Sequence, residues 1–206
     1  MGSGADWATG DAKRALAVDA ESQPPDSAQV IVRVRHSMFE GLYDRVLKPT
    51  GDFQRQLAEA GYDRARPKTE YPITVWIACL DLSAATVYPA ERPERAVWLL
   101  GRRFIEGYLE TIIGKLIGAS FPFLSAATFM KRVPRFVGSG LVDAPTRLTW
   151  EGERRCVLTI GGSSWYPGPL MGGVVEVSLE RIGVKGAQLI ANDRTSPEGR
   201  LEVAWS

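Results

Sequence analysis

The sequence contains one histidine, two cysteines and no long apolar run that is free of charges. A structural zinc site needs about four Cys or His ligands, so His36, Cys79 and Cys156 are too few and too scattered for one. We therefore expect no metal and no cofactor. No uncharged apolar run reaches about 18 residues, so the sequence indicates no membrane-spanning helix.

The sequence also lacks a charge excess of either sign. Lysine and arginine total 25 against 24 acidic residues, so no global field would attract nucleic acid or an anionic membrane. The two cysteines lie inside apolar runs, which is typical of reduced, buried thiols in a cytoplasmic protein. Whether Cys79 is modified stays open.

Catalytic motifs are equally scarce. Gly161-Gly162-Ser163-Ser164 lacks the Gly-Lys-Ser/Thr ending of a phosphate-binding loop. No pair of nucleophile and general base is visible, so we expect a protein that is not an enzyme. If it were an enzyme of unknown type, Asp81 and Glu106 would be the carboxylates to inspect.

The most prominent positive feature is the stretch from Glu94 to Ser120. Apolar residues recur there at three- and four-residue steps, which predicts one unbroken helix with a broad apolar face. Gly107 and Gly114 fall on one side of that helix. A glycine inside a helix costs about 1 kcal/mol against alanine, so this pair indicates that another backbone or a ligand approaches closely.

The rest of the N-terminal half predicts short elements after a flexible tail at residues 1–27. The expected elements are a strand at 28–35, a helix at 38–47 capped by Ser37, a helix at 53–60, an ambiguous segment at 72–82 and a helix at 126–132. The 72–82 segment fits strand or helix, and we favour helix. Pro134 is expected to end the last helix, with a flexible joint at 138–140.

The last third predicts a hairpin, a helix and a second hairpin. Alternating runs at 146–150 and 154–160 flank Glu151-Gly152-Glu153, and runs at 185–192 and 200–205 flank a turn around Pro197. A helix at 170–182 lies between them. The expected fold is α+β: one domain over residues 28–206, with a helical N-terminal half packed on a four-stranded antiparallel sheet.

Three segments carry a family resemblance: GRRFIEGYLETIIGKLIGA, SMFEGLYDRVL and the final LEVAW. Together they resemble a paralogous family of unknown function that is largely restricted to myxobacteria, over most of the chain from about residue 30. The Gly101-Arg102 and Gly107-Tyr108-x-x-Thr111-x-x-Gly114 pattern is the most specific part. The resemblance supplies no activity.

The order of elements is also similar, at the level of the fold, to four-vinyl-reductase, haem–nitric-oxide-binding and transport-particle-subunit domains. That resemblance implies an apolar cavity between helices and sheet, and often a homodimer. The chain departs from the motifs of two branches. It has no late cysteine cluster beyond Cys156, and it has no Tyr-x-Ser-x-Arg stretch with a proximal histidine.

Aromatic residues beside the central helix suggest where such a cavity would lie. The candidate ligand-binding residues are Trp76, Trp98, Phe104, Tyr108, Thr111, Trp165 and Tyr166. Cavities for small ligands are apolar with a few placed polar groups, but ordinary core packing would explain the same residues.

Three hypotheses follow. The first is a non-catalytic binding module that senses a small apolar or aromatic ligand and signals to an unknown protein partner. The second is a homodimeric scaffold without a ligand, whose interface is the apolar face of the central helix. The third is an enzyme.

Overall fold

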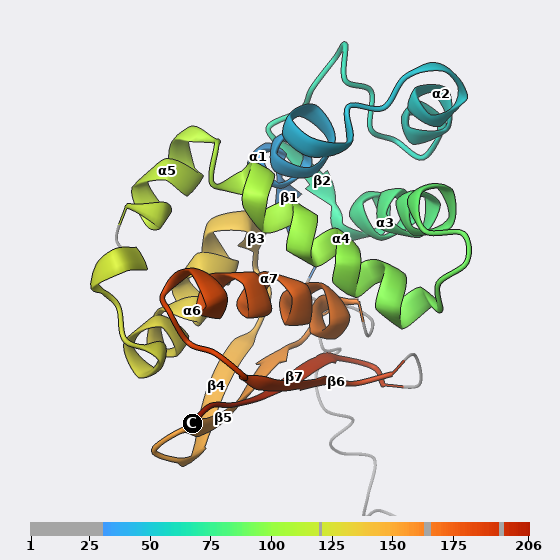
Figure 1. The fold of residues 1–206 in the computed structure, drawn as a ribbon. Coiled ribbons are helices and arrows are strands. Elements are labelled where there is room, and N and C mark those ends of the chain that lie inside the picture. Colours follow the sequence, from blue (N-terminus) through green and yellow to red (C-terminus); the bar gives the residue numbers. More distant parts are fainter. Residues whose placement is uncertain (1–30, 120, 163–165, 194–195) are drawn as a thin grey trace, which may run out of the picture.

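The computed structural model describes residues 31–119, 121–162, 166–193 and 196–206. A four-stranded sheet forms one side of the molecule and helices are stacked on its inner face (Figure 1). Helix α7 (Pro167–Arg181) lies on the sheet, and α4 (Pro93–Tyr108) crosses above α7. The remaining N-terminal helices cover α4 from the far side. The α+β architecture predicted from the sequence is confirmed.

The first helix follows directly after β1 (Arg33–Arg35), and its hydrogen-bonding pattern changes along its length. It is α-helical in α1 (His36–Phe39) and a π-helix in η1 (Glu40–Leu47), where Lys48 N–H donates to the Tyr43 carbonyl. The expected Ser37 cap is wrong, because the helix starts at His36, two residues before the predicted start, and no side chain caps it. Lys48, in the left-handed region at φ 47°, ends it.

Two further helices follow, α2 (Gly51–Glu59) and α3 (Ile73–Val87). The ambiguous segment after Pro72 is therefore helical, as favoured, and it continues five residues beyond the predicted end. Between them, β2 (Glu70–Pro72) pairs with β1, which also pairs with β3 (Leu141–Val142). This small three-stranded sheet was not predicted, because its strands have only two or three residues each.

The central helix is broken, which corrects the prediction of one helix from 94 to 120. Helix α4 ends at Tyr108 and a separate short helix, α5 (Ile112–Gly118), follows. Thr111 lies at the break, where its hydroxyl donates to the Tyr108 carbonyl at 2.7 Å and accepts from Gly114 N–H at 3.0 Å. A side chain that bonds to the backbone in this way competes with the helical ladder.

After η2 (Phe121–Phe123), α6 (Ala126–Gly140) begins at Ser125, whose hydroxyl accepts from Thr128 N–H at 3.2 Å as the sequence predicted. The expected end before Pro134 and the joint at 138–140 are wrong, because the helix runs through both. Val133 and Val137 are buried on its inner side. Their packing outweighs the hydrogen bond that proline removes.

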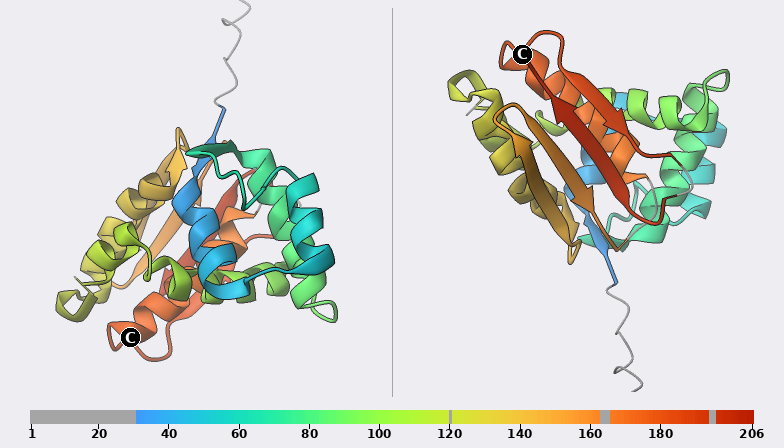
Figure 2. Two further views of the ribbon diagram at one scale, coloured as in Figure 1. Left: turned by 90° about the horizontal axis from the view of Figure 1, so that it is seen from above. Right: turned by 90° about the horizontal axis from the view of Figure 1, so that it is seen from below.

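The four-stranded sheet consists of two antiparallel hairpins, as predicted. Strands β4 (Thr146–Gly152) and β5 (Arg155–Ile160) form the first, and β6 (Gln188–Ala191) and β7 (Gly199–Ala204) form the second. The order β4-β5-β7-β6 brings the two hairpins together through β5 and β7. Figure 2 shows the outer face of the sheet, which no helix of the described ranges covers.

Two hydrophobic cores result from this layering. The helical core gathers α1, η1, α2, α3 and α4 around Phe39, Tyr43 and Leu100. The sheet core packs α6 and the inner face of the sheet around Met130, Leu158 and Val203. Helix α7 contributes to both, with Leu170, Val174 and Val177 in the first and Val175 and Leu179 in the second. In the described part of the chain, no helix is long and apolar enough to cross a lipid bilayer.

Candidate functional site

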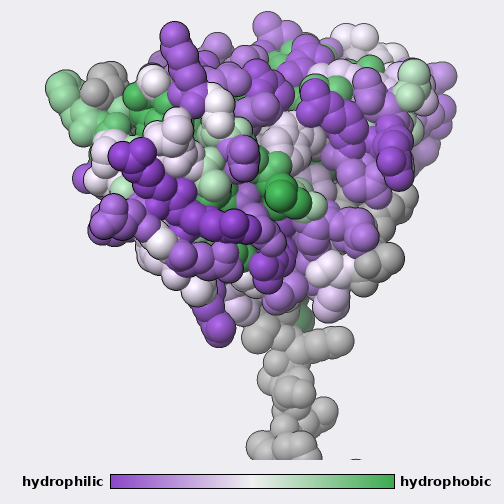
Figure 3. Space-filling model, turned by 60° about the horizontal axis from the view of Figure 1, so that its bottom comes forward, coloured by the Kyte–Doolittle hydropathy of each residue, from purple (hydrophilic) through white to green (hydrophobic). Residues whose placement is uncertain are grey.

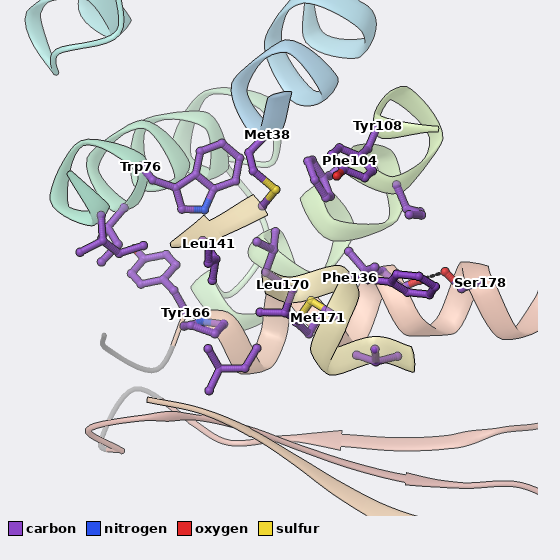
Figure 4. Close-up of a pocket in the computed structure, with 18 of the residues that line it drawn as sticks. Met38, Trp76, Phe104, Tyr108, Phe136, Leu141, Tyr166, Leu170, Met171 and Ser178 are labelled. Atoms are coloured by element: carbon purple, nitrogen blue, oxygen red, sulfur yellow. Dashed lines mark hydrogen bonds between the residues drawn. The ribbon is translucent and has the colours of Figure 1, made fainter. Parts of the chain in front are cut away.

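An apolar cavity of about 80 Å³ lies where the two cores meet (Figure 4). Residues from nearly every helical layer surround it. The lining consists of Met38, Ile73, Trp76, Ile77, Phe104, Ile105, Tyr108, Phe121, Phe129, Val133, Phe136, Val137, Leu141, Ile160, Tyr166, Pro167, Leu170, Met171, Val174 and Ser178. The cavity therefore touches α1, α3, α4, α6, α7 and β5 at once.

These lining residues include no charged side chain. Their hydroxyls are partly engaged by the protein itself: Ser178 donates to the Val174 carbonyl at 2.7 Å, within α7. The Tyr108 hydroxyl is 3.1 Å from Ser139 Oγ, and Ser139 donates to the Phe136 carbonyl at 2.6 Å. Tyr108 is therefore the donor to Ser139. Such a wall suits a molecule that offers mostly carbon surface.

Four of the predicted site residues lie in this wall: Trp76, Phe104, Tyr108 and Tyr166. Trp76 comes from α3, and Phe104 and Tyr108 lie one turn apart on α4 with ring centroids 5.3 Å apart. The Trp76 and Phe104 rings meet edge to face at 6.2 Å. The structure therefore brings α3 and α4 into contact at the cavity, a contact that no sequence pattern indicated.

Trp98 and Thr111 are not part of the lining. Trp98 packs against α7, where its indole N–H donates to Glu176 at 2.7 Å, and Arg102 pairs with the same carboxylate at 2.6 Å. Partial burial alone would raise the pKa of Glu176, but these two hydrogen bonds outweigh it and the pKa is lowered. Thr111 holds the end of α4, and Trp165 lies outside the described residues.

Sequence reasoning missed the contribution of α6 and most of α7. Phe129, Val133 and Phe136 recur at four- and three-residue steps on α6, a helical period that continues past Pro134. Assigning the helix end to Pro134 hid that stripe. Met38 and Met171 also line the cavity, and their flexible thioether chains adapt to irregular space.

The glycines of the helix crossings allow backbones to touch. A β-carbon at Gly107 would lie against the Gly41 carbonyl of η1, and one at Gly101 against the Leu170 carbonyl of α7. A β-carbon at Gly114 would meet the Tyr108 carbonyl, so that approach belongs to the break between α4 and α5. These contacts fix α4, which carries two aromatic residues of the cavity wall.

Neither Asp81 nor Glu106, the carboxylates singled out for an enzyme, lines the cavity, and both are exposed. Among the described residues, no group of three or more His, Cys, Asp and Glu side chains has the arrangement of a metal site. The apolar face of α4, expected as a dimer interface, is buried inside the chain against η1, α3 and α7.

A family model for a protein of unknown function, DUF2378, matches residues 32–206. The chain belongs to this family. The match covers the whole α+β domain and begins just before β1. No curated protein sequence matches the chain.

The fold of this chain is similar to that of solved H-NOX proteins. One from S. oneidensis in the Fe(II)NO state has a TM-score of 0.59 at 12% identity, covering 84% of this chain and 99% of its own. The Fe(II) unliganded protein from K. algicida gives 0.54 at 12% identity, covering 83% and 95%. An oxygen-binding H-NOX domain related to soluble guanylate cyclases gives 0.52 at 12%, covering 82% and 89%. At these identities the likeness shows the fold.

The iron in those proteins raises the question of whether the cavity fits a haem. Haem iron takes an axial His, Cys, Tyr or Met ligand, set in place by neighbouring hydrogen bonds. Within the described ranges no histidine or cysteine lines the cavity, and His36 lies elsewhere, beside the rings of Tyr62 and Tyr71. Tyr108, Tyr166, Met38 and Met171 do line it, but they surround a space of only about 80 Å³. No described lysine or arginine lines it to meet the haem carboxylates, and even an engineered cavity of about 150 Å³ takes up a molecule only as large as benzene. The residues do not fit a haem.

Proposed function

We propose that this chain is a non-catalytic sensor module that holds a small apolar or aromatic molecule in the cavity and reports it to a protein partner. The observation that carries the proposal is the uncharged wall, to which both hydrophobic cores contribute. A ligand there would gain dispersion contacts with helices of both layers. An aromatic ligand would also have to push these helices apart, because the cavity of about 80 Å³ is smaller than the cavity of about 150 Å³ that takes up benzene. The H-NOX-like fold supports a sensor role by analogy.

The cavity wall also suggests how occupancy would be reported. Helices α4 and α6 face each other across it and are joined by the hydrogen bond from Tyr108 to Ser139. A ligand that binds one spacing of these helices better than another shifts the population towards that spacing. A partner that contacts the outer side of α6 would then sense the change.

We further propose that the protein works in the cytoplasm. Cys79 and Cys156 are free and buried, and unpaired thiols are typical of reducing compartments. Burial raises the pKa of Cys79 to about 12, and burial followed by the charge of Glu151 raises the pKa of Cys156 to about 11. Both thiols therefore stay protonated and unreactive, which supports a structural role over modification.

The test is native mass spectrometry of protein purified without denaturation, followed by organic extraction. We expect a reproducible extra mass that solvent releases. Val133→Phe, which fills the cavity from α6, should lose the adduct. The matched control Ile190→Phe adds the same ring at an exposed position on β6 and should keep it.

Xenon serves as a second probe, because it enters small apolar cavities without specific contacts. If the wild type carries no adduct and its NMR spectrum does not respond to xenon, the sensor proposal is wrong. A bare dimer in the native mass spectrum would favour a homodimeric scaffold instead, with an interface other than the buried face of α4.

A further inference from the structure

The segment between α4 and α6 carries an unusual set of exposed apolar side chains. Ile112 and Leu116 of α5 are 84% and 77% exposed, and Phe123 of η2 is 88% exposed. Isolated exposed apolar residues are normal. However, the described residues contain five large hydrophobic side chains that are exposed, and three of them fall within these twelve positions. We call these three residues the apolar tip.

The apolar tip protrudes from one edge of the molecule. Helix α5 stands away from the body in Figure 1, and hydrophobic side chains reach the surface along that edge in Figure 3. Ile112 and Leu116 are four residues apart and so share one side of α5. Phe121, two residues before Phe123, points the other way into the cavity wall. Phe121 thus anchors η2 inside the molecule while Phe123 of the same element faces outward.

The same part of the chain is one-sided in charge. Residues 111–142 contain no acidic residue and four basic ones, Lys115, Lys131, Arg132 and Arg135, although the whole chain has a net charge of only +1. All four are exposed, and none forms an ion pair with any residue that the structure describes. The nearest acids along the chain are Glu110 and Asp143, just outside the segment.

Helix α6 separates its apolar and basic residues. Phe129, Val133 and Val137 are on the side that faces the cavity. Arg135 lies four residues after Lys131 and three after Arg132, so these three side chains share the outer side of α6. The Lys131 ammonium is 5.9 Å from the Trp150 ring centroid. We call these three residues and Lys115 the cationic face. Lys115 lies between Ile112 and Leu116 on α5, and Figures 1 and 2 show α5 and α6 at the same edge of the molecule, so the apolar tip and the cationic face share that edge.

We propose that the apolar tip and the cationic face dock the protein on the surface of an anionic lipid bilayer, without spanning it. Apolar side chains that protrude singly can enter the boundary between headgroups and acyl chains, while Lys and Arg remain with the lipid phosphates. A stable protein interface takes about 20–30 residues on each partner, whereas the apolar tip and the cationic face together consist of the seven residues named above. The proposal is independent of any ligand in the cavity.

The test is co-sedimentation of the full chain with lipid vesicles. One set contains phosphatidylcholine alone and the other contains phosphatidylcholine with phosphatidylglycerol. We expect binding to the anionic vesicles only, weakened by NaCl because salt screens exposed charges. The variant Ile112→Ser/Leu116→Ser/Phe123→Ser should bind about tenfold or more weakly, since insertion scales with buried apolar area.

A second variant, Lys115→Gln/Arg132→Gln/Arg135→Gln, should lose both binding and its salt dependence. Matched controls make the same changes elsewhere: Ile190→Ser, and Lys68→Gln/Arg92→Gln/Arg147→Gln. These positions are exposed, so the controls should bind like the wild type. Thermal melting should be the same for all five proteins, because exposed positions contribute little to stability.

The proposal is overturned if the wild type binds neither set of vesicles. It is also overturned if the serine variant binds as well as the wild type, because another surface would then be responsible. If the wild type self-associates, binds no vesicle and becomes monomeric on serine substitution, the apolar tip is an interface between two copies of the chain.

Discussion

Gly107 illustrates how one missing side chain positions a helix. Its α-carbon lies so close to η1 that a β-carbon would overlap the Gly41 carbonyl and crowd Val46 and Arg45. A backbone carbonyl cannot move aside as a flexible side chain can. The glycine therefore determines how closely α4 and η1 pack, and with it the position of Tyr108 in the cavity wall.

We predict that Gly107→Ala lowers the free energy of unfolding by roughly 1–3 kcal/mol, the usual cost of overpacking a tight contact. This is against the intrinsic helix preference, which favours alanine by up to about 1 kcal/mol. Urea denaturation of the two proteins measures the difference.

Gly138 provides the matched control. It is also inside a helix, α6, but a β-carbon there meets no atom within 4 Å. Gly138→Ala should therefore stabilise the protein slightly. If both alanine variants change stability in the same direction, close approach at Gly107 is not the reason for its glycine.

At the scale of elements, α4 and α6 are linked across the cavity by one short polar chain. Tyr108 donates to Ser139, which donates to the Phe136 carbonyl. Few other contacts join these helices, because the cavity lies between them. The link should therefore matter for how firmly α6 closes the cavity.

We predict that Tyr108→Phe and Ser139→Ala each lower the free energy of unfolding by about 1 kcal/mol, the usual net value of a hydrogen bond. The double variant should be less destabilised than the sum of the two, with a coupling of about 0.5 kcal/mol or more. Denaturation of the four proteins gives this cycle.

Tyr88→Phe is the control for this cycle, because Tyr88 lies at the end of α3, away from Ser139. Its effect should simply add to that of Ser139→Ala. Strict additivity of Tyr108→Phe with Ser139→Ala would mean that the two hydroxyls do not interact in solution.

At the scale of the whole molecule, the burial of ionisable groups in the two cores makes the stability of the fold depend on pH. Burial is the main cause that raises the pKa of Cys79 to about 12 and of Cys156 to about 11, against 9.0 for an ordinary thiol. Burial also raises the pKa of Tyr43 and Tyr62 above 10.0. In the unfolded chain these groups lose their protons at lower pH than in the folded chain.

The stability that these groups provide is thus complete below about pH 9 and is lost as pH rises towards the folded pKa values. We predict a lower urea midpoint at pH 10.5 than at pH 8, with each thiol contributing about 2 kcal/mol. The variant Cys79→Ala/Cys156→Ala should show a smaller fall between the two pH values. An equal fall in both proteins would assign it to other groups.

The sequence predicted much of the fold because many of its signals are local. Strand alternation and turn residues identified both hairpins, and the Ser125 cap located the start of α6. Four cavity residues were also named from the sequence, because Phe104 and Tyr108 lie on one helical face and Trp76 and Tyr166 lie in neighbouring apolar segments.

Other features depended on contacts between distant segments. Periodicity continued through Thr111 and could not reveal the break after Tyr108, whereas Pro134 suggested an end that core packing overrides. Trp98 is an aromatic residue of the kind that lines pockets, but its indole N–H donates to Glu176, 78 positions away. The apolar stripe of α6 that lines the cavity was missed because the helix was expected to end at Pro134.

The sequence by itself determined the α+β class, the two hairpins and the balanced total charge, since these follow from local patterns and composition. Only the tertiary structure decided which apolar residues surround a cavity and which, like Ile112, Leu116 and Phe123, face solvent. The hydrophobic effect acts on surface that is removed from water. Which surface that is depends on how the segments pack, and not on the apolar residues alone.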